Sequence, residues 1–251
     1  MLNKINTLLT SAIGTTIKEI KTTAYPGLTG QTSNFIILPA GITQGSLGLL
    51  LIGSTRGTSA NNDVSELGIP TGFTLIDKLE TRQGDGRNAS QGLFYKYMTA
   101  SDSSTTISTL FANSRSENAV AIFIEVILNK NINIQGFDDL INLSSGTTTA
   151  AATLTNVPSV ITGNSPFFLL TCGLAGGGGG YVSGVLTGGM QLYDTSETIL
   201  SVGSTTNIDM KLLKYDNILI KDLPSTEDAI FSVIVNGTGH ASAGVYVIWF
   251  K

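Results

Sequence analysis

The sequence predicts an all-β protein: an antiparallel β-sandwich, jelly-roll-like, with an internal duplication. Two observations predict the fold class. Apolar stretches are short and rich in Val, Ile, Phe and Tyr, and clusters of Gly, Asn, Asp, Ser and Thr separate them. Charged residues make up only 13% of the 251-residue chain, about half the usual quarter, while apolar residues reach 41%. We therefore expect a folded chain whose surface carries mainly hydroxyls and amides.

The first 34 residues are expected to form an N-terminal arm that packs on a neighbour, or a short edge element. Residues 17–21 alternate over too short a span to distinguish a helix from a strand, and Tyr25-Pro26-Gly27 indicates a turn. Apolar side chains of the arm are candidate interface anchors, because apolar groups bury best at the centre of a contact. These residues are Leu2, Ile5, Leu8, Leu9 and Ile13.

Each half of the remaining chain contains five predicted strands. In the first half they are residues 49–52, 73–76, 93–97, 105–111 and 119–126. Residues 119–126 are apolar on both faces, so we expect this strand at the centre of a sheet. In the second half the strands are residues 167–172, 190–193, 210–215, 230–235 and 245–250. The last of these has no charged residue, and we expect it to be buried between neighbours.

The order of motifs repeats between the halves. Gly53 matches Gly173, residues 71–77 match 188–194, residues 93–97 match 211–215, and the strand from Ala119 matches the one from Gly244. The offsets lie between 117 and 125 residues, which chance similarity between strands seldom maintains in order. The duplication predicts that the halves superpose strand for strand. Lys96 should then lie over Lys214, and Asp77 over Asp194.

We expect the first repeat to span residues 35–135 and the second to span 136–251. The halves could be separate domains or could complete one another in one sandwich. Residues 142–155, rich in Ser, Thr and Ala, are too apolar towards their end for a plain linker. This favours one tightly packed unit.

The residues usually needed for catalysis and metal binding are scarce. The chain has one cysteine, Cys172, and one histidine, His240. A zinc site built from several cysteines therefore lacks its ligands, and most acid–base catalytic arrangements lack their usual histidine. Residues 176–180 are all glycine, but no Lys-Ser/Thr follows them as in a phosphate-binding loop, and we expect an inter-strand loop. His240 is expected in a hairpin loop. We therefore predict that the protein is not an enzyme and binds neither a cofactor nor a metal ion.

Acidic and aromatic residues have simpler explanations than a site. The acidic clusters lack the spacing of a calcium loop and are expected to be solvated; they are Asp63 with Glu66, Asp85, Asp138 with Asp139, and Glu227 with Asp228. Asp138 and Asp139 in particular are expected in a turn. Aromatic residues that could stack on sugars lie on predicted strands, so we expect core packing for Tyr95, Tyr97, Tyr215 and Trp249.

Charge and hydropathy exclude several partners. The net charge is −4 and the sequence pI is about 4.9, so no basic footprint exists for nucleic acid. The longest apolar run, residues 119–128, is interrupted by Glu125 and is too short to span a bilayer. The N-terminus has no continuous apolar segment typical of a secretory signal, so we expect folding in a cytoplasm.

Several segments in order resemble a known family. Residues 48–52 (GLLLI), 70–77 (PTGFTLID) and 93–102 (LFYKYMTASD), followed by the strand at Ala119, are similar to tandem β-sandwich proteins encoded in structural gene blocks of tailed bacteriophages. These proteins often carry GDLLL, PAGWTL, a tyrosine-lysine strand and an ASEP-like turn. The resemblance covers residues 34–251. Phe73 replaces the tryptophan, and the turn at Ser101-Asp102-Ser103 lacks the proline.

The resemblance implies a non-enzymatic virion structural protein, a capsid decoration or cement protein on the virion surface, assembled in the host cytoplasm. Its partners would be the major capsid protein or other virion proteins, and it would form a homo-oligomer. The alternative is a tail- or fibre-associated adhesin that binds a surface glycan. Low charge further predicts that attachment depends on apolar contacts and neutral hydrogen bonds, with little effect of salt.

Overall fold

The computed structural model describes residues 17–28, 34–56, 67–80, 88–110, 118–128, 137–146, 149–154, 167–175, 181–183, 197–204, 208–215, 231–236 and 241–250. These residues form fifteen β-strands and one short 3-10 helix, Ala100–Asp102. All strand pairings are antiparallel. The all-β antiparallel prediction is therefore confirmed.

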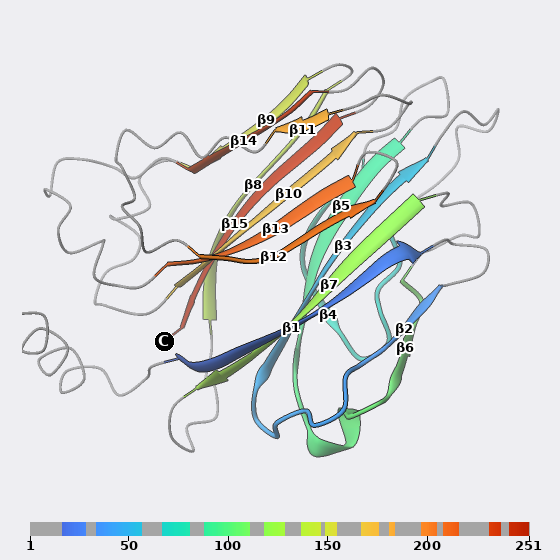
Figure 1. Cartoon of the computed structure of the whole chain (residues 1–251), viewed down its shortest axis with the longest axis vertical. Helices are drawn as coiled ribbons and strands as arrows, with labels where there is room; N and C mark the ends of the chain where they lie inside the picture. Colours follow the sequence, from blue (N-terminus) through green and yellow to red (C-terminus); the bar gives the residue numbers. More distant parts are fainter. Residues whose placement is uncertain are drawn as a thin grey trace, which may run out of the picture.

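The first half of the chain builds one five-stranded sheet and a small outer pair (Figure 1). The order of the large sheet is β1 (Ile17–Leu28), β7 (Asn118–Leu128), β3 (Leu47–Arg56), β5 (Asn88–Tyr97) and β4 (Thr74–Glu80). The outer pair is β2 (Phe35–Ile37) with β6 (Thr106–Ser108). β7 lies between β1 and β3, which confirms the central position predicted for residues 119–126.

The second half also has a five-stranded sheet and a smaller sheet, and its smaller sheet has one more strand than the β2–β6 pair. Its five-stranded sheet has the order β12 (Glu197–Ser204), β13 (Ile208–Tyr215), β10 (Phe167–Ala175), β15 (Ala241–Phe250) and β8 (Phe137–Gly146). A smaller sheet contains β11 (Tyr181–Ser183), β14 (Phe231–Asn236) and β9 (Thr149–Leu154).

The connectivity of each half is nested, as in a jelly roll. β1 pairs with β7 and β2 with β6; correspondingly, β8 pairs with β15 and β9 with β14. The third strand of each half, β3 or β10, lies at the middle of its sheet. β12 occupies the edge position that corresponds to β4, whereas the sequence comparison matches residues 71–77 to residues 188–194; residues 188–194 lie outside the described part of the chain. Superposition of the halves stays a prediction.

The two large sheets pack face to face and share one core. Leu47, Leu49 and Leu51 of β3 meet Tyr246 and Ile248 of β15 in a single cluster of buried side chains. Residues from both halves thus form the same hydrophobic core. Burial of these apolar side chains is the main source of stability at this contact.

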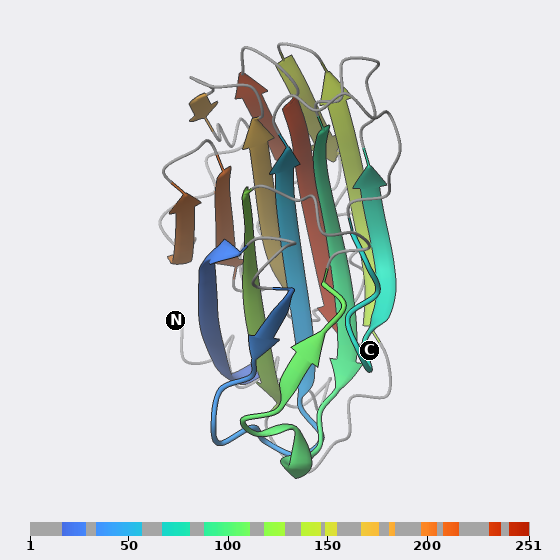
Figure 2. The same ribbon diagram turned by 90° about the vertical axis from the view of Figure 1, so that its right-hand side faces the viewer.

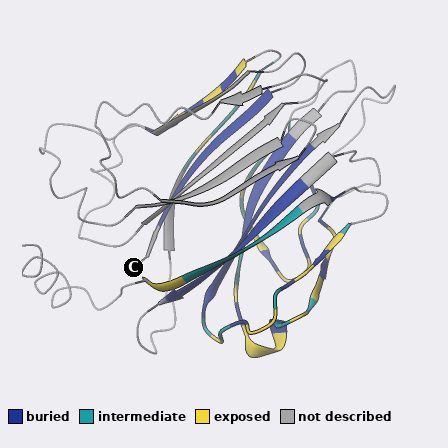
Figure 3. Ribbon diagram, viewed as in Figure 1, coloured by how far each residue is buried: buried dark blue, intermediate teal, exposed yellow. Residues whose placement is uncertain are grey.

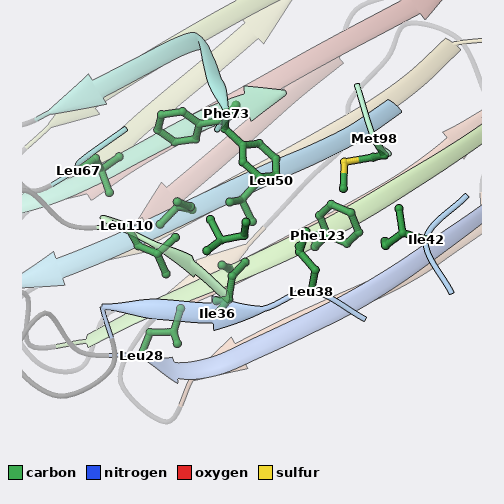
Figure 4. Close-up of a cluster of buried hydrophobic side chains, with 14 residues drawn as sticks. Leu28, Ile36, Leu38, Ile42, Leu50, Leu67, Phe73, Met98, Leu110 and Phe123 are labelled. Carbon is green, nitrogen blue, oxygen red and sulfur yellow. The ribbon is translucent and has the colours of Figure 1, made fainter. Parts of the chain in front are cut away.

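The opposite face of the first sheet is covered as well. On this face Leu50, Phe94 and Phe123 form one buried cluster with Ile36 and Ile107 of the β2–β6 pair. Figure 4 shows Leu50, Phe123 and Ile36 of this cluster. Figure 2 shows β2 and β6 lying in front of the first sheet. A strand buried on both faces needs apolar residues at every position, which explains the continuous apolar run in β3.

Several local predictions were wrong. Tyr25-Pro26-Gly27 does not form a turn: β1 continues to Leu28, with a register shift between Tyr25 and Leu28 that accommodates the proline. Asp138 and Asp139 lie in β8 and not in a turn. Residues 142–155 are not a plain linker, as expected, but the strands there were not predicted: they contain the end of β8 and the whole of β9. The strand predicted at residues 105–111 is shorter, because Thr109 adopts a positive φ of 62° after β6.

The terminal strand β15 is buried as predicted. Val245, Tyr246, Val247 and Ile248 have no exposed surface, because β15 lies between β10 and β8 and is covered on both faces. The side chains of its last two residues lie outside the description.

Candidate functional site

The most distinctive exposed surface lies on the β2–β6 pair (Figure 3). The pairing sets Phe35 opposite Ser108, Ile36 opposite Ile107, and Ile37 opposite Thr106. Because side chains alternate across a strand, Ile36 and Ile107 point into the core while the other two pairs face outward. Phe35 and Ile37 are 45% and 53% exposed.

Residues 68–71 extend this surface beside β6. The Gly68 amide donates a hydrogen bond to the Leu110 carbonyl at 3.0 Å, and the Thr71 amide donates to the Ser108 carbonyl at 3.0 Å. Ile69, between these two contacts, is 60% exposed. We call the exposed side chains of this region the outer face. It consists of Phe35, Ile37, Ile69, Thr71, Thr106, Ser108 and Thr109.

Hydroxyl groups of the outer face form a network. The Thr71 Oγ1 atom lies 3.0 Å from both the Ser108 Oγ and the Thr109 Oγ1 atoms. Its own backbone is fixed by the contact with Ser108. The outer face therefore combines apolar side chains with neutral hydrogen-bonding groups, and it contains no ionisable residue.

The outer face is held on a well-connected frame. The Leu38 amide donates to the Thr105 carbonyl at 2.9 Å, and the Tyr25 hydroxyl donates to the Ile37 carbonyl at 2.7 Å. Burial raises the pKa of Tyr25 to about 12, so this hydroxyl keeps its proton at neutral pH. The hydrogen bond that links β1 to β2 is therefore insensitive to pH over the physiological range.

Asp102 is engaged in a structural contact. Its Oδ1 accepts from Lys96 Nζ at 2.6 Å, and its Oδ2 accepts from the Thr99 amide at 2.8 Å and the Thr99 hydroxyl at 2.9 Å. Burial raises the pKa of Asp102, but the hydrogen bonds from Lys96 and Thr99 outweigh it, and the net pKa is lowered. The carboxylate fixes the turn that follows β5.

Glu125 has a similar role in β7, which the sequence did not reveal. Its side chain is buried, and its Oε1 accepts from the Thr43 amide at 2.6 Å and from the Ser46 hydroxyl at 2.9 Å. Lys21 Nζ lies 3.6 Å from the other carboxylate oxygen. In the sequence Glu125 only interrupts an apolar run, whereas in the structure it ties the turn before β3 to β7.

A buried polar contact joins the two halves. Gln91 of β5 donates through Nε2 to the Ser242 hydroxyl, and its Oε1 accepts from the Tyr246 hydroxyl at 3.1 Å. All three side chains are fully buried. This contact fixes how the two sheets align, because a shift would leave buried polar groups without partners.

The expected interface residues Leu2, Ile5, Leu8, Leu9 and Ile13 lie outside the described residues, as do Asp63, Glu66, Asp85, His240 and residues 176–180. Glu227 and Asp228 lie outside them too, and of Tyr215, Trp249 and Cys172 only the backbone is described. Tyr95 packs against the shared core as expected. The prediction of core packing was wrong for Tyr97, whose surface is 41% exposed because this residue is the last of β5.

Neither a membrane-spanning helix nor a cluster of three metal-binding side chains occurs within the described part of the chain. No protein-family model, curated protein or solved structure matches this sequence or fold.

Proposed function

We propose that this chain is a non-enzymatic structural protein of a tailed-phage virion, a decoration or cement protein that attaches to the capsid through the outer face. The observation that carries the attachment surface is the composition of that face: Phe35, Ile37 and Ile69 stand exposed among threonine and serine hydroxyls, without a charge. The virion assignment is supported by the motif order at residues 48–52, 70–77 and 93–102.

The chemistry of the described charged groups supports a structural role. Asp102 and Glu125 accept hydrogen bonds from backbone and side-chain donors of neighbouring turns. Both oxygens of Asp102 and Oε1 of Glu125 accept these hydrogen bonds and so help to hold the fold. A protein that works by contact needs a stiff frame and an exposed complementary surface.

The attachment test uses virion particles and a double variant. The wild-type protein should be present at hundreds of copies when purified particles are quantified by mass spectrometry against the major capsid protein. Phe35→Ser with Ile37→Ser should remove it from particles, whereas Lys18→Ser, an exposed change on β1, should not. A handful of wild-type copies, or release of wild-type protein by moderate salt alone, would refute decoration through this face.

Residues 2–14 are proposed as a second contributor, since they contain Leu2, Ile5, Leu8, Leu9 and Ile13. The deletion must stop before Ile17, because β1 begins there and pairs along its length with β7. Reduced occupancy of particles by a folded protein lacking residues 2–14 is the expected result. Full occupancy would exclude this contribution.

One observation favours the alternative, a glycan-binding adhesin. Tyr97 is exposed, and its ring meets that of Tyr95 edge-on, with centroids 5.8 Å apart and an interplanar angle of 80°. An exposed aromatic ring held in place by a second ring is a suitable platform for a sugar. Binding on a glycan array that Tyr97→Ala abolishes and Tyr97→Phe retains would support this function; no binding by the wild type would exclude it.

A further inference from the structure

Four described strands form the edges of the two large sheets: β1, β4, β12 and β8. An edge strand presents unpaired backbone N–H and C=O groups and invites another strand to pair with it. Proteins block such pairing with bulges, charged side chains and prolines at the edge.

Three of these four edges are irregular. β1 has register shifts between Ile17 and Glu19 and between Tyr25 and Leu28. β4 has a register shift between Leu75 and Asp77 in its pairing with β5. β12 has one between Thr198 and Leu200 in its pairing with β13. Each shift interrupts the regular spacing that an added strand would need.

β8 is different. It pairs with β15 over ten consecutive residue pairs, from Phe137 opposite Phe250 to Gly146 opposite Ala241, without a register shift. Its sequence, FDDLINLSSG, contains no proline, and its two charged residues, Asp138 and Asp139, lie near one end of the strand. Among the described residues no strand pairs with its other edge. β8 thus offers a straight, regular edge of the kind that the other three strands avoid.

The sequence of β8 is self-complementary in one register. In an antiparallel pairing of two β8 strands centred on Asn142, Ile141 lies opposite Leu143 of the second copy, and Asp139 lies opposite Ser145. Ile141 and Leu143 are only partly buried and already pack against the shared core, so this pairing would cover their remaining surface. In this register Asp139 lies opposite a serine and Asp138 lies opposite Gly146, whereas a parallel in-register pairing would set each aspartate against its own copy.

We propose that the protein forms a twofold-symmetric dimer by antiparallel pairing of two β8 strands, which joins two five-stranded sheets into one of ten strands. A twofold contact uses the same patch on both subunits, and the register centred on Asn142 satisfies that requirement. The proposal does not depend on the attachment to a capsid.

The test changes the charge at Ser145, which is exposed and lies opposite Asp139 of the second copy in the proposed register. Ser145→Asp sets two carboxylates against each other twice in each dimer and should weaken dimerisation about tenfold or more. Ser145→Lys should keep or tighten the dimer. Ala151→Asp, at an exposed position of β9 in the same half, controls for added charge and should leave the dimer unchanged.

Sedimentation velocity of the full-length protein over a range of concentrations measures the outcome, and circular dichroism verifies that each variant is folded. The proposal is overturned by a wild-type protein that is monomeric at the highest soluble concentration. It is also overturned if Ser145→Asp dimerises as tightly as the wild type, because dimerisation would then use another surface. A wild-type protein that dimerises but is absent from purified particles would refute the proposed function alone.

Discussion

Replacing Glu125 should show that a buried carboxylate, and not an ion pair, holds the turn before β3. Oε1 of Glu125 accepts two hydrogen bonds, from the Thr43 amide at 2.6 Å and the Ser46 hydroxyl at 2.9 Å. A hydrogen bond to a charged group contributes about 1.5–3 kcal/mol, and a donor left without an acceptor costs a comparable amount. The Thr43 amide would lose its acceptor, whereas the Ser46 hydroxyl also lies 2.7 Å from the Thr43 carbonyl and would keep one. Glu125→Ala should therefore lower the free energy of unfolding by about 3–5 kcal/mol.

Two matched variants separate the contributions. Glu125→Gln keeps an acceptor oxygen and should lower the free energy of unfolding by about 1 kcal/mol. Lys21→Ala removes the ion pair, but Nζ lies 3.6 Å from the carboxylate and the lysine side chain is 41% exposed, so solvent screening limits the loss to about 1 kcal/mol or less.

Equilibrium unfolding in urea, followed by tryptophan fluorescence and circular dichroism, measures these differences. We expect the largest loss of stability for Glu125→Ala, a smaller loss for Glu125→Gln and the smallest for Lys21→Ala. A Glu125→Gln protein as unstable as Glu125→Ala would show that the charge matters more than the acceptor. A Glu125→Ala protein within 1 kcal/mol of the wild type would refute the role assigned to the carboxylate altogether.

Three further outcomes are expected. Gly48→Ala should destabilise the fold by about 1–3 kcal/mol in the same urea assay, because a Cβ atom there would lie 2.5 Å from Met98 Sδ and 2.9 Å from Phe123 Cε2; an unchanged midpoint would contradict this packing. The pKa of Asp102 is lowered in the folded state, so its contribution to stability is present above the ordinary value of 3.8 and is lost as the pH falls below it. Acid titration of Asp102→Asn should accordingly show a weaker fall in stability, and a profile identical to the wild type would refute the linkage. Truncation after Gly244 should abolish cooperative folding, because each apolar side chain lost from β15 contributes about 1.5–3 kcal/mol; a soluble, cooperatively folded fragment would disprove its central position.

Strands buried on both faces were predictable from the sequence, and strands of small residues were not. β3 and β7 are continuous apolar runs because each lies between two cores. β9 alternates buried Ala150, Ala152 and Leu154 with exposed small residues, so its period of two carries little hydrophobic contrast. The composition of this segment therefore argued against a plain linker but did not reveal the strand.

The candidate site was largely invisible for a related reason. Phe35 and Ile37 flank Ile36 in a short apolar run, and the sequence alone does not show that only Ile36 points inward. The pairing with β6 decides which side chains are exposed. Likewise Tyr97 resembles a core residue until its place at the end of β5 is known. Exposure in both cases depends on contacts between segments far apart in the chain.

The nested connectivity has a consequence for how the protein folds. β1 cannot pair until β7 has been synthesised, and β8 must wait in the same way for β15, so the first strand of each half stays unpaired while about a hundred residues are added. The entropy cost of closing such long loops must be met before the strands form stabilising contacts, and this slows folding. During translation the first sheet can close before the second half has emerged from the ribosome. The apolar face that later contacts Tyr246 and Ile248 would then be exposed to solvent. During this time, binding of a chaperone or rapid folding of the second half would protect the chain from aggregation.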